Sequence, residues 1–273
     1  MIIVVEKGVL KEVNVDYEKD IGVKEFAIPD GVAILADESL AHLPLEVEML
    51  YIPKSVKKIH EGAFFGEGSN WENLKNIIVE EGNKNYKSQT GCLIDINSNT
   101  VILGTENAII PNGIEKIGVY AFRQRAGLTE ITIPESVKEV DLQAFACCNN
   151  LKKVTVLGEK TNLDYLCFIL DTAIEEFNLP EKADYEFIDG CLVKKSCETL
   201  LMLTEKGEIP KNIVTIWTWA CARYCKDVVV PETVVSFAEN AFLLLGGGKL
   251  KVKKDSPAHK YAVENELNYE IIR

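Results

Sequence analysis

A proline-containing motif recurs along this chain at a nearly constant interval. Ile-Pro occupies residues 28–29, 52–53, 110–111, 133–134 and 209–210, and Leu179-Pro180 and Val230-Pro231 are relatives of it. Pro134 follows Pro111 by 23 residues and Pro180 follows Pro134 by 46, which is two intervals with Leu157 at the middle position. An interval of roughly 20 to 50 residues is typical of repeat proteins. The spacing therefore predicts a single elongated solenoid over residues 1–273.

Each repeat also carries apolar residues at fixed distances from its proline. Six residues after it stand Leu35, Ile59, Ile117, Val140, Leu163, Ile216 and Phe237. Eleven residues after it, next to a small residue, stand Leu40, Phe64, Phe122, Phe145, Phe168, Cys221 and Phe242. Equivalent residues of stacked turns meet, so we expect a continuous spine of phenylalanines. The strands before the prolines should form one parallel sheet, in an α/β or mainly β fold.

A second, rarer unit interrupts the coil. Gly91-Cys92-Leu93 and Gly190-Cys191-Leu192 each lie 20 residues before an Ile-Pro pair, and Gly8-Val9-Leu10 looks like a third copy. We interpret each unit as a β-hairpin insert with its glycine in the turn. The solenoid is then divided into modules at residues 1–81, 82–182 and 183–248.

Residues 249–273 have the features of a closing cap. Lys249, Lys251 and Lys253 alternate with apolar residues, which predicts a last strand whose lysines discourage edge pairing. Ser256-Pro257 is a typical helix start, with serine as the cap and proline in the first turn, and predicts a helix over residues 258–266.

The repeat pattern resembles a known family. Residues 52–64 and 133–145 share Ile-Pro, then Ser-Val-Lys, then Ala-Phe, and Cys148 and Leu151 fit the cysteine and leucine of the BspA-like leucine-rich repeat family. The resemblance implies a right-handed leucine-rich-repeat coil with a parallel strand ladder. It also implies a bacterial protein of the adhesion type that binds other proteins through its repeats, and it supplies no catalytic residues.

Charge and hydropathy exclude some partners. The formal net charge of −12, without a basic stripe, argues against nucleic-acid binding. No apolar stretch approaches the roughly 20 residues of a spanning helix, so we expect no membrane insertion. Met1 to Val5 do not begin an export signal, which predicts a cytoplasmic protein. The alternative is an extracellular or cell-surface location, if such a signal had been removed.

Cysteine and histidine positions do not indicate chemistry. The cysteines stand at 92, 147, 148, 167, 191, 197, 221 and 225, and several fall in core columns, which predicts eight free thiols and no metal site. His42, His60 and His259 lie in separate units. We therefore expect no catalytic residue and no cofactor. An enzyme with a site between the solenoid and the inserts is the alternative.

One candidate binding row lies two residues before the prolines, where side chains should point out of the sheet. Tyr51, Thr132, Thr155 and Asn178 belong to this row. Small polar side chains at its centre suit hydrogen bonding to a protein or glycan partner. The alternative interpretation is an ordinary solvated sheet face.

A second candidate is the pair Trp217 and Trp219, at positions that elsewhere hold mostly polar or small residues and, in one repeat, Tyr120. Exposed indoles are unfavourable and tryptophan is enriched at interfaces, so this edge could contact a partner or a second copy in a homo-oligomer. The alternative is that both fold back beneath an insert as extra packing.

Overall fold

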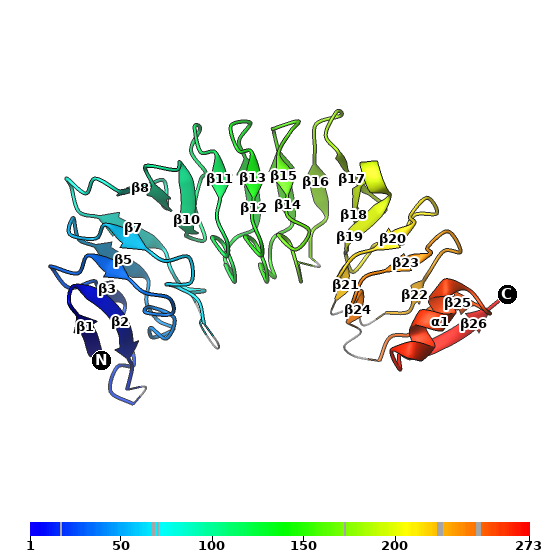
Figure 1. The fold of residues 1–273 in the computed structure, drawn as a ribbon, viewed down its shortest axis with the longest axis horizontal. Helices are drawn as coiled ribbons and strands as arrows, with labels where there is room; N and C mark the ends of the chain where they lie inside the picture. Colours follow the sequence, from blue (N-terminus) through cyan, green and yellow to red (C-terminus); the bar gives the residue numbers. More distant parts are fainter. Residues whose placement is uncertain (17, 67–68, 70, 172, 223–225, 244–246) are drawn as a thin grey trace.

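The chain forms a mostly-β solenoid. The structure, a computed structural model, describes residues 1–16, 18–66, 69, 71–171, 173–222, 226–243 and 247–273. Figure 1 shows the turns stacked along an arc, with the two termini at opposite ends. The solenoid and its parallel ladders confirm the fold class predicted from the repeat.

The strands before the prolines, together with their equivalents, form what we call the proline ladder. It is divided into three sheets, not one: β3 (Glu25–Ala27), β5 (Met49–Ile52) and β7 (Asn76–Val79); β12 (Glu130–Ile133), β14 (Lys153–Val156) and β16 (Glu176–Asn178); β22 (Val228–Val229), β25 (Leu250–Lys253) and β26 (Tyr269–Ile272). The expectation of one continuous sheet was therefore wrong. Each break falls where an insert enters the chain.

Two-residue strands after the prolines form what we call the second ladder, which is also divided among three sheets. They are β4 (Ile34–Leu35), β6 (Lys58–Ile59), β11 (Lys116–Ile117), β13 (Glu139–Val140), β15 (Asn162–Leu163), β20 (Thr215–Ile216) and β23 (Ser236–Phe237). A short third pairing joins β21 (Cys221–Ala222) to β24 (Phe242–Leu243). Each strand is short because the chain turns twice within one repeat.

The inserts extend the second ladder. The middle insert is a three-stranded meander of β8 (Tyr86–Gln89), β9 (Cys92–Asp95) and β10 (Thr100–Gly104), whose last strand pairs with β11. The last insert repeats it with β17 (Tyr185–Ile188), β18 (Cys191–Lys194), a 3-10 turn at Lys195–Cys197 and β19 (Thr199–Leu203). Gly91 and Gly190 occupy the predicted turns with φ of 79° and 71°, a region that glycine adopts without strain.

The N-terminal insert is not a full third copy. It has only β1 (Ile2–Glu6) and β2 (Val9–Asn14), and β2 pairs with β4 in the way that β10 pairs with β11. Gly8, with φ of 77°, therefore occupies the place of the β9–β10 turn and not the place of Gly91. The similarity of the short glycine motifs misaligned this unit by one strand.

The buried phenylalanines form an aromatic stack in the middle of the arc. The ring centroids of Phe122, Phe145 and Phe168 are 5.0 Å apart in succession, with interplanar angles of 11° and 6°. Phe64 instead packs edge-on against Trp71, with the centroids 5.7 Å apart. The spine is thus continuous only within residues 82–182, because inserts separate it from its neighbours on both sides.

The contact between the last residue of each insert and the turn that follows it differs between the two modules in side-chain size. The backbone N–H groups of Gly104 and Leu203 donate to equivalent carbonyls, of Ala121 and Ala220, at 2.8 Å in both cases. A Cβ atom on Gly104 would lie 2.0 Å from the Phe122 ring. In the last module Leu203 shares its core with Cys221 at the position of that phenylalanine. The middle module thus pairs a glycine with a phenylalanine at these two positions, and the last module pairs a leucine with a cysteine.

The C-terminal cap contains the predicted helix, α1 (Pro257–Glu264), and Ser256 Oγ accepts a hydrogen bond from the His259 N–H at 3.1 Å. The expectation of a last strand with protecting lysines was wrong, because β26 pairs with β25 on its far side. Lys251 and Lys253 instead form ion pairs with Asp227 and Glu232 of the preceding turn, at 3.0 Å and 2.8 Å.

Candidate functional site

The outward row of the proline ladder stacks as its sequence spacing predicts. Thr132, Thr155 and Asn178 are register partners, and Asn178 Nδ2 donates weakly to Thr155 Oγ1 at 3.4 Å. Tyr51 lies in the N-terminal sheet, aligned with Ala27 and not with the threonines. The structure therefore places the predicted binding residues in two separate sheets.

A shallow hollow without charged residues lies beside Thr132. It has a volume of about 480 Å³, and its lining residues are Gln89, Thr90, Ile109, Ile110, Pro111, Asn112, Thr132, Pro134 and Leu157. Ile109 is 69% exposed and Leu157 is 51% exposed. We call this the uncharged hollow. Neither Ile109, which belongs to the same outward row, nor Leu157, which replaces the proline of its repeat, was predicted as a binding residue from the sequence.

A second apolar hollow surrounds Tyr51. Its volume is about 410 Å³, and Ala27, Tyr51 and Ile78 meet in it as neighbours across three strands. Asp30 and Glu80 also line it. Both hollows lie on the outward row, so this face exposes apolar surface at two points along the arc.

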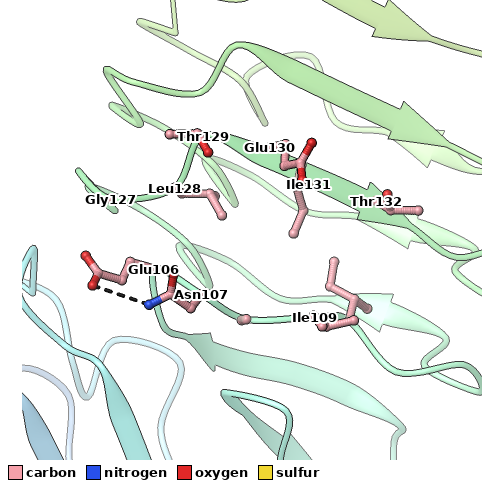
Figure 2. A pocket seen from close by; sticks show the side chains of 11 residues that line it. Glu106, Asn107, Ile109, Gly127, Leu128, Thr129, Glu130, Ile131 and Thr132 are labelled. Atoms are coloured by element: carbon pink, nitrogen blue, oxygen red, sulfur yellow. Dashed lines mark hydrogen bonds between the residues drawn. The ribbon is translucent and has the colours of Figure 1, made fainter.

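A groove opens where the middle insert returns to the coil. It has a volume of about 340 Å³, with residues 106–110 as one wall and residues 127–132, which lead into β12, as the other (Figure 2). The same groove recurs in the last module between residues 205–211 and residues 226–231, with a volume of about 410 Å³. We call these the first and second grooves.

The predicted aromatic edge packs largely against the protein itself. The Trp217 ring lies 4.4 Å from the Tyr165 ring of the preceding module, and Trp219 borders the small space beside Tyr165 and Leu203. Tyr120 likewise packs on Phe65, with centroids 5.2 Å apart, across the middle insert. All three side chains are half-buried. They lie after the second ladder, apart from the threonine row in the proline ladder.

The five buried cysteines that the structure describes are poor nucleophiles. Burial raises the pKa of the Cys92 and Cys191 thiols to about 12, and it raises the pKa of Cys148, Cys167 and Cys221 well above the usual value. A thiol with so high a pKa stays protonated near neutral pH. No disulfide joins the seven cysteines that the structure describes. Cys225 lies outside the described residues, and the expectation of eight free thiols stays a prediction.

Arg125 is a fully buried charge that the sequence analysis missed. Its Nε donates to the Gly104 carbonyl at 2.5 Å, and Nη1 donates to the carbonyls of Trp71 and Arg123 at 3.0 Å and 2.9 Å. Burial lowers its pKa to about 10. Because these carbonyls belong to both sides of the middle insert, the guanidinium joins the first two modules and is structural.

Among the residues that the structure describes, neither the His60 nor the His259 imidazole hydrogen-bonds to a serine or cysteine side chain. His60 Nδ1 lies 3.3 Å from Asp37 Oδ2 at the surface, and His259 Nδ1 accepts from the Asp255 N–H within the cap. Over the part of the chain that the structure describes, no cluster of three or more potential metal-ligating side chains occurs. Over the same residues, no helix is both long and apolar enough to span a bilayer.

Comparison with family models identifies the repeat. The model of the BspA type leucine rich repeat region matches residues 17–103 and 102–199, with six copies. A search of curated proteins found no significant match.

One solved structure shares the fold at low sequence identity, and two others give weaker matches. A leucine-rich repeat protein from Eubacterium ventriosum matches with a TM-score of 0.50 and 19% identity, over 85% of this chain and 66% of its own length. This chain therefore spans just under two thirds of that protein. A leucine rich cell surface protein from Faecalibacterium prausnitzii matches with a TM-score of 0.43 and 20% identity, over 86% of this chain and 70% of that one. The pneumococcal vaccine antigen PcpA matches with a TM-score of 0.42 and 18% identity, over 91% and 68%.

Proposed function

The chain belongs to the BspA-type leucine-rich repeat family, and from that premise we propose that it is a protein-binding module rather than an enzyme. Its binding surface in this proposal is the outward face of the proline ladder, centred on the uncharged hollow. Adhesion-type binding by a bacterial protein, which the family resemblance implies, is part of the same proposal.

The uncharged hollow is the observation that carries this proposal. Charged residues make up 26% of the chain, yet none lines the hollow, and Ile109 and Leu157 expose their apolar side chains there. Depletion of charge at the centre and a polar rim are what distinguish protein interfaces from the remaining surface. Gln89, Thr90, Asn112 and Thr132 supply hydrogen-bonding groups around the two apolar side chains.

A paired surface variant tests the proposal. Ile109→Asp with Leu157→Asp should reduce capture of the protein's partner more than tenfold, because burying two new carboxylates in an interface is costly. Val235→Asp is the matched control, since Val235 is 59% exposed in the last module, away from the hollow. Immobilised wild-type and variant proteins would be compared for the proteins and glycans that they retain. Identical retained sets, with unchanged thermal melts, would refute a role for this face.

The predicted cytoplasmic location remains a proposal, and its alternative is the extracellular or cell-surface location that adhesion-type binding requires. The buried, protonated thiols described above fit a reducing compartment. Thiol titration in denaturant of freshly purified protein should give eight thiols, and four or fewer would point to an exported, disulfide-bonded protein.

A further inference from the structure

The first groove is a place where the proline ladder has been opened. In the N-terminal module the Ile28 N–H donates to the Tyr51 carbonyl of the next turn at 3.0 Å. The equivalent groups at the groove are the Ile110 N–H and the Thr132 carbonyl, and no hydrogen bond joins them among the described residues. The ladder is interrupted here by one missing set of backbone contacts.

The wall formed by residues 106–110 is bonded to the insert on its other side. The Ile109 N–H donates to the Thr90 carbonyl at 2.9 Å and Thr90 Oγ1 donates to the Ile109 carbonyl, so the β8–β9 turn holds the side of this wall that faces away from β12. The other wall ends its sheet. The carbonyls of Thr129 and Ile133 accept from Lys153 and Leu157 of the next turn, so the alternate residues Glu130 and Thr132 turn their peptide groups toward the groove.

The last module has the same break in the proline ladder after its insert, so the break accompanies the insert. The Glu208 N–H donates to the Asp189 carbonyl at 2.8 Å, and β22 begins the next sheet as β12 does. The two grooves differ in charge. The first is lined by Glu106 and Glu130 and by no basic residue, whereas the second is of mixed charge. Its charged lining residues are Glu205, Lys206, Glu208, Lys211, Lys226 and Asp227.

We infer that the first groove binds an extended, basic peptide segment of a partner protein, which adds to β12 as a strand. An open strand edge is a template for such pairing, in which main-chain hydrogen bonds give affinity and alternate side chains give specificity. A lysine or arginine of the added segment lies beside Glu130, and a branched apolar side chain lies between Thr132 and Ile109. This inference rests on the proposed protein-binding function and names the kind of segment that is bound.

A peptide with the chain's own strand sequence is a suitable probe. Residues 151–158, Leu-Lys-Lys-Val-Thr-Val-Leu-Gly, include β14, which pairs with β12 on its other edge. Fluorescence anisotropy of the labelled peptide should show saturable binding to the full chain. A peptide methylated at every second backbone nitrogen should bind at least about tenfold more weakly, because it loses main-chain donors.

Matched variants locate the binding. Thr132→Pro removes an N–H that faces the groove and should weaken binding about tenfold, while Val229→Pro, its equivalent in the second groove, should change affinity less than about twofold. Glu130→Lys should weaken the lysine peptide and strengthen a version with both lysines replaced by glutamate. If Thr132→Pro fails to fold in a thermal melt, Glu130→Lys and the methylated peptide decide the question.

Absence of saturable binding, equal binding of the methylated peptide, or equal effects of Thr132→Pro and Val229→Pro would overturn strand addition. Loss of partner capture by the Ile109→Asp, Leu157→Asp variant would then leave the proposed function standing. If the peptide binds as expected but that double variant retains every partner, the uncharged hollow is not the binding surface and the added segment does not contact Ile109, while strand addition to β12 stands.

Discussion

The middle module, residues 82–182, and the last module, residues 183–248, have the same insert and the same backbone bonds but different cores. Both inserts end in a strand whose final N–H donates to the following turn at 2.8 Å, from Gly104 in one and Leu203 in the other. The middle module places Phe122 over its glycine, and the last places Cys221 near its leucine. The repeat thus fixes the backbone, while the volume of the core is shared between an insert and the turn that follows it.

The two modules also differ in how their aromatic residues are supported. Phe145 is stacked between two parallel rings, and its side chain is fully buried. Phe242 has Cys221 on one side and the rings of Phe237 and Tyr261, at 6.2 Å and 6.0 Å, on the other. A stack of like residues depends on each member, whereas a mixed cluster near the end of an array can adjust.

Removal of a ring should have the largest effect. We expect Phe145→Ala to lower the free energy of unfolding by about 3–5 kcal/mol, because it leaves a cavity with folded turns on both sides. Phe242→Ala should cost less, since its surroundings near the end of the array relax more easily. Urea unfolding of the two variants measures the difference, and equal shifts in midpoint would contradict the contrast between the modules.

The second-largest effect on stability should come from giving the middle module the leucine and cysteine of the last module. Gly104→Leu should cost about 3 kcal/mol, because the new side chain overlaps the Phe122 ring, which Phe145 holds in place. Adding Phe122→Cys reproduces the pair found in the last module and should restore more than half of the loss. A double variant no more stable than Gly104→Leu alone, by the same urea measurement, would show that the two cores are not interchangeable.

Much of this architecture could be predicted from the chain alone. The Ile-Pro interval and the columns around Phe122, Phe145 and Phe168 predicted the turns, the stack and the family, because stacking requires equivalent residues to recur. The breaks in the proline ladder and the grooves beside β12 could not be predicted. They depend on the Ile110 N–H, which among the described residues does not bond to the Thr132 carbonyl although Ile110 belongs to the same Ile-Pro motif as Ile28.

The size exchange between Gly104 and Leu203 was hidden for a related reason. A single column shows what a position tolerates, but the compensation lies between two columns from different units. Trp217 and Trp219 illustrate the same limit, since their packing against Tyr165 crosses from one module to the next.

Cys92 and Cys191, which occupy equivalent positions in the two inserts, should ionise alike, and this tests a respect in which the two modules are the same. Burial raises the pKa of Cys92 and Cys191 to about 12 from 9.0. The unfolded chain therefore loses these protons first, so each thiol's contribution to stability is present below pH 9 and is lost as the pH rises toward 12.

Replacing either cysteine by alanine should reduce the loss of unfolding free energy between pH 8 and pH 10 by about 1 kcal/mol. Urea unfolding at the two pH values measures this for Cys92→Ala and Cys191→Ala. A pH dependence that neither substitution alters would mean that these thiols ionise as readily in the folded state as in the unfolded one.

The smallest expected effect concerns the half-buried tryptophans of the last module. In a Trp71→Phe background, acrylamide should quench Trp217 and Trp219 only partly, because Tyr165 and the preceding turn shield one side of them. A further fall in quenching on raising the protein concentration or adding a partner would support the predicted contact at this edge. Quenching that is insensitive to both would limit these indoles to packing between modules.

The spacing of the inserts has a genetic consequence. Gly190 lies 99 residues after Gly91, and both glycines sit in equivalent turns beside equivalent walls, since Ile109 bonds to Thr90 as Glu208 bonds to Asp189. Deleting the codons for residues 92–190 would join Gly91 to Cys191, and duplicating them would join Gly190 to a second Cys92. Leu203 and Cys221, which pack in one core, would stay in the same module in either case. Recombination between such sequences could shorten or lengthen the arc by whole modules. The length of the solenoid can therefore change in evolution while its fold is kept.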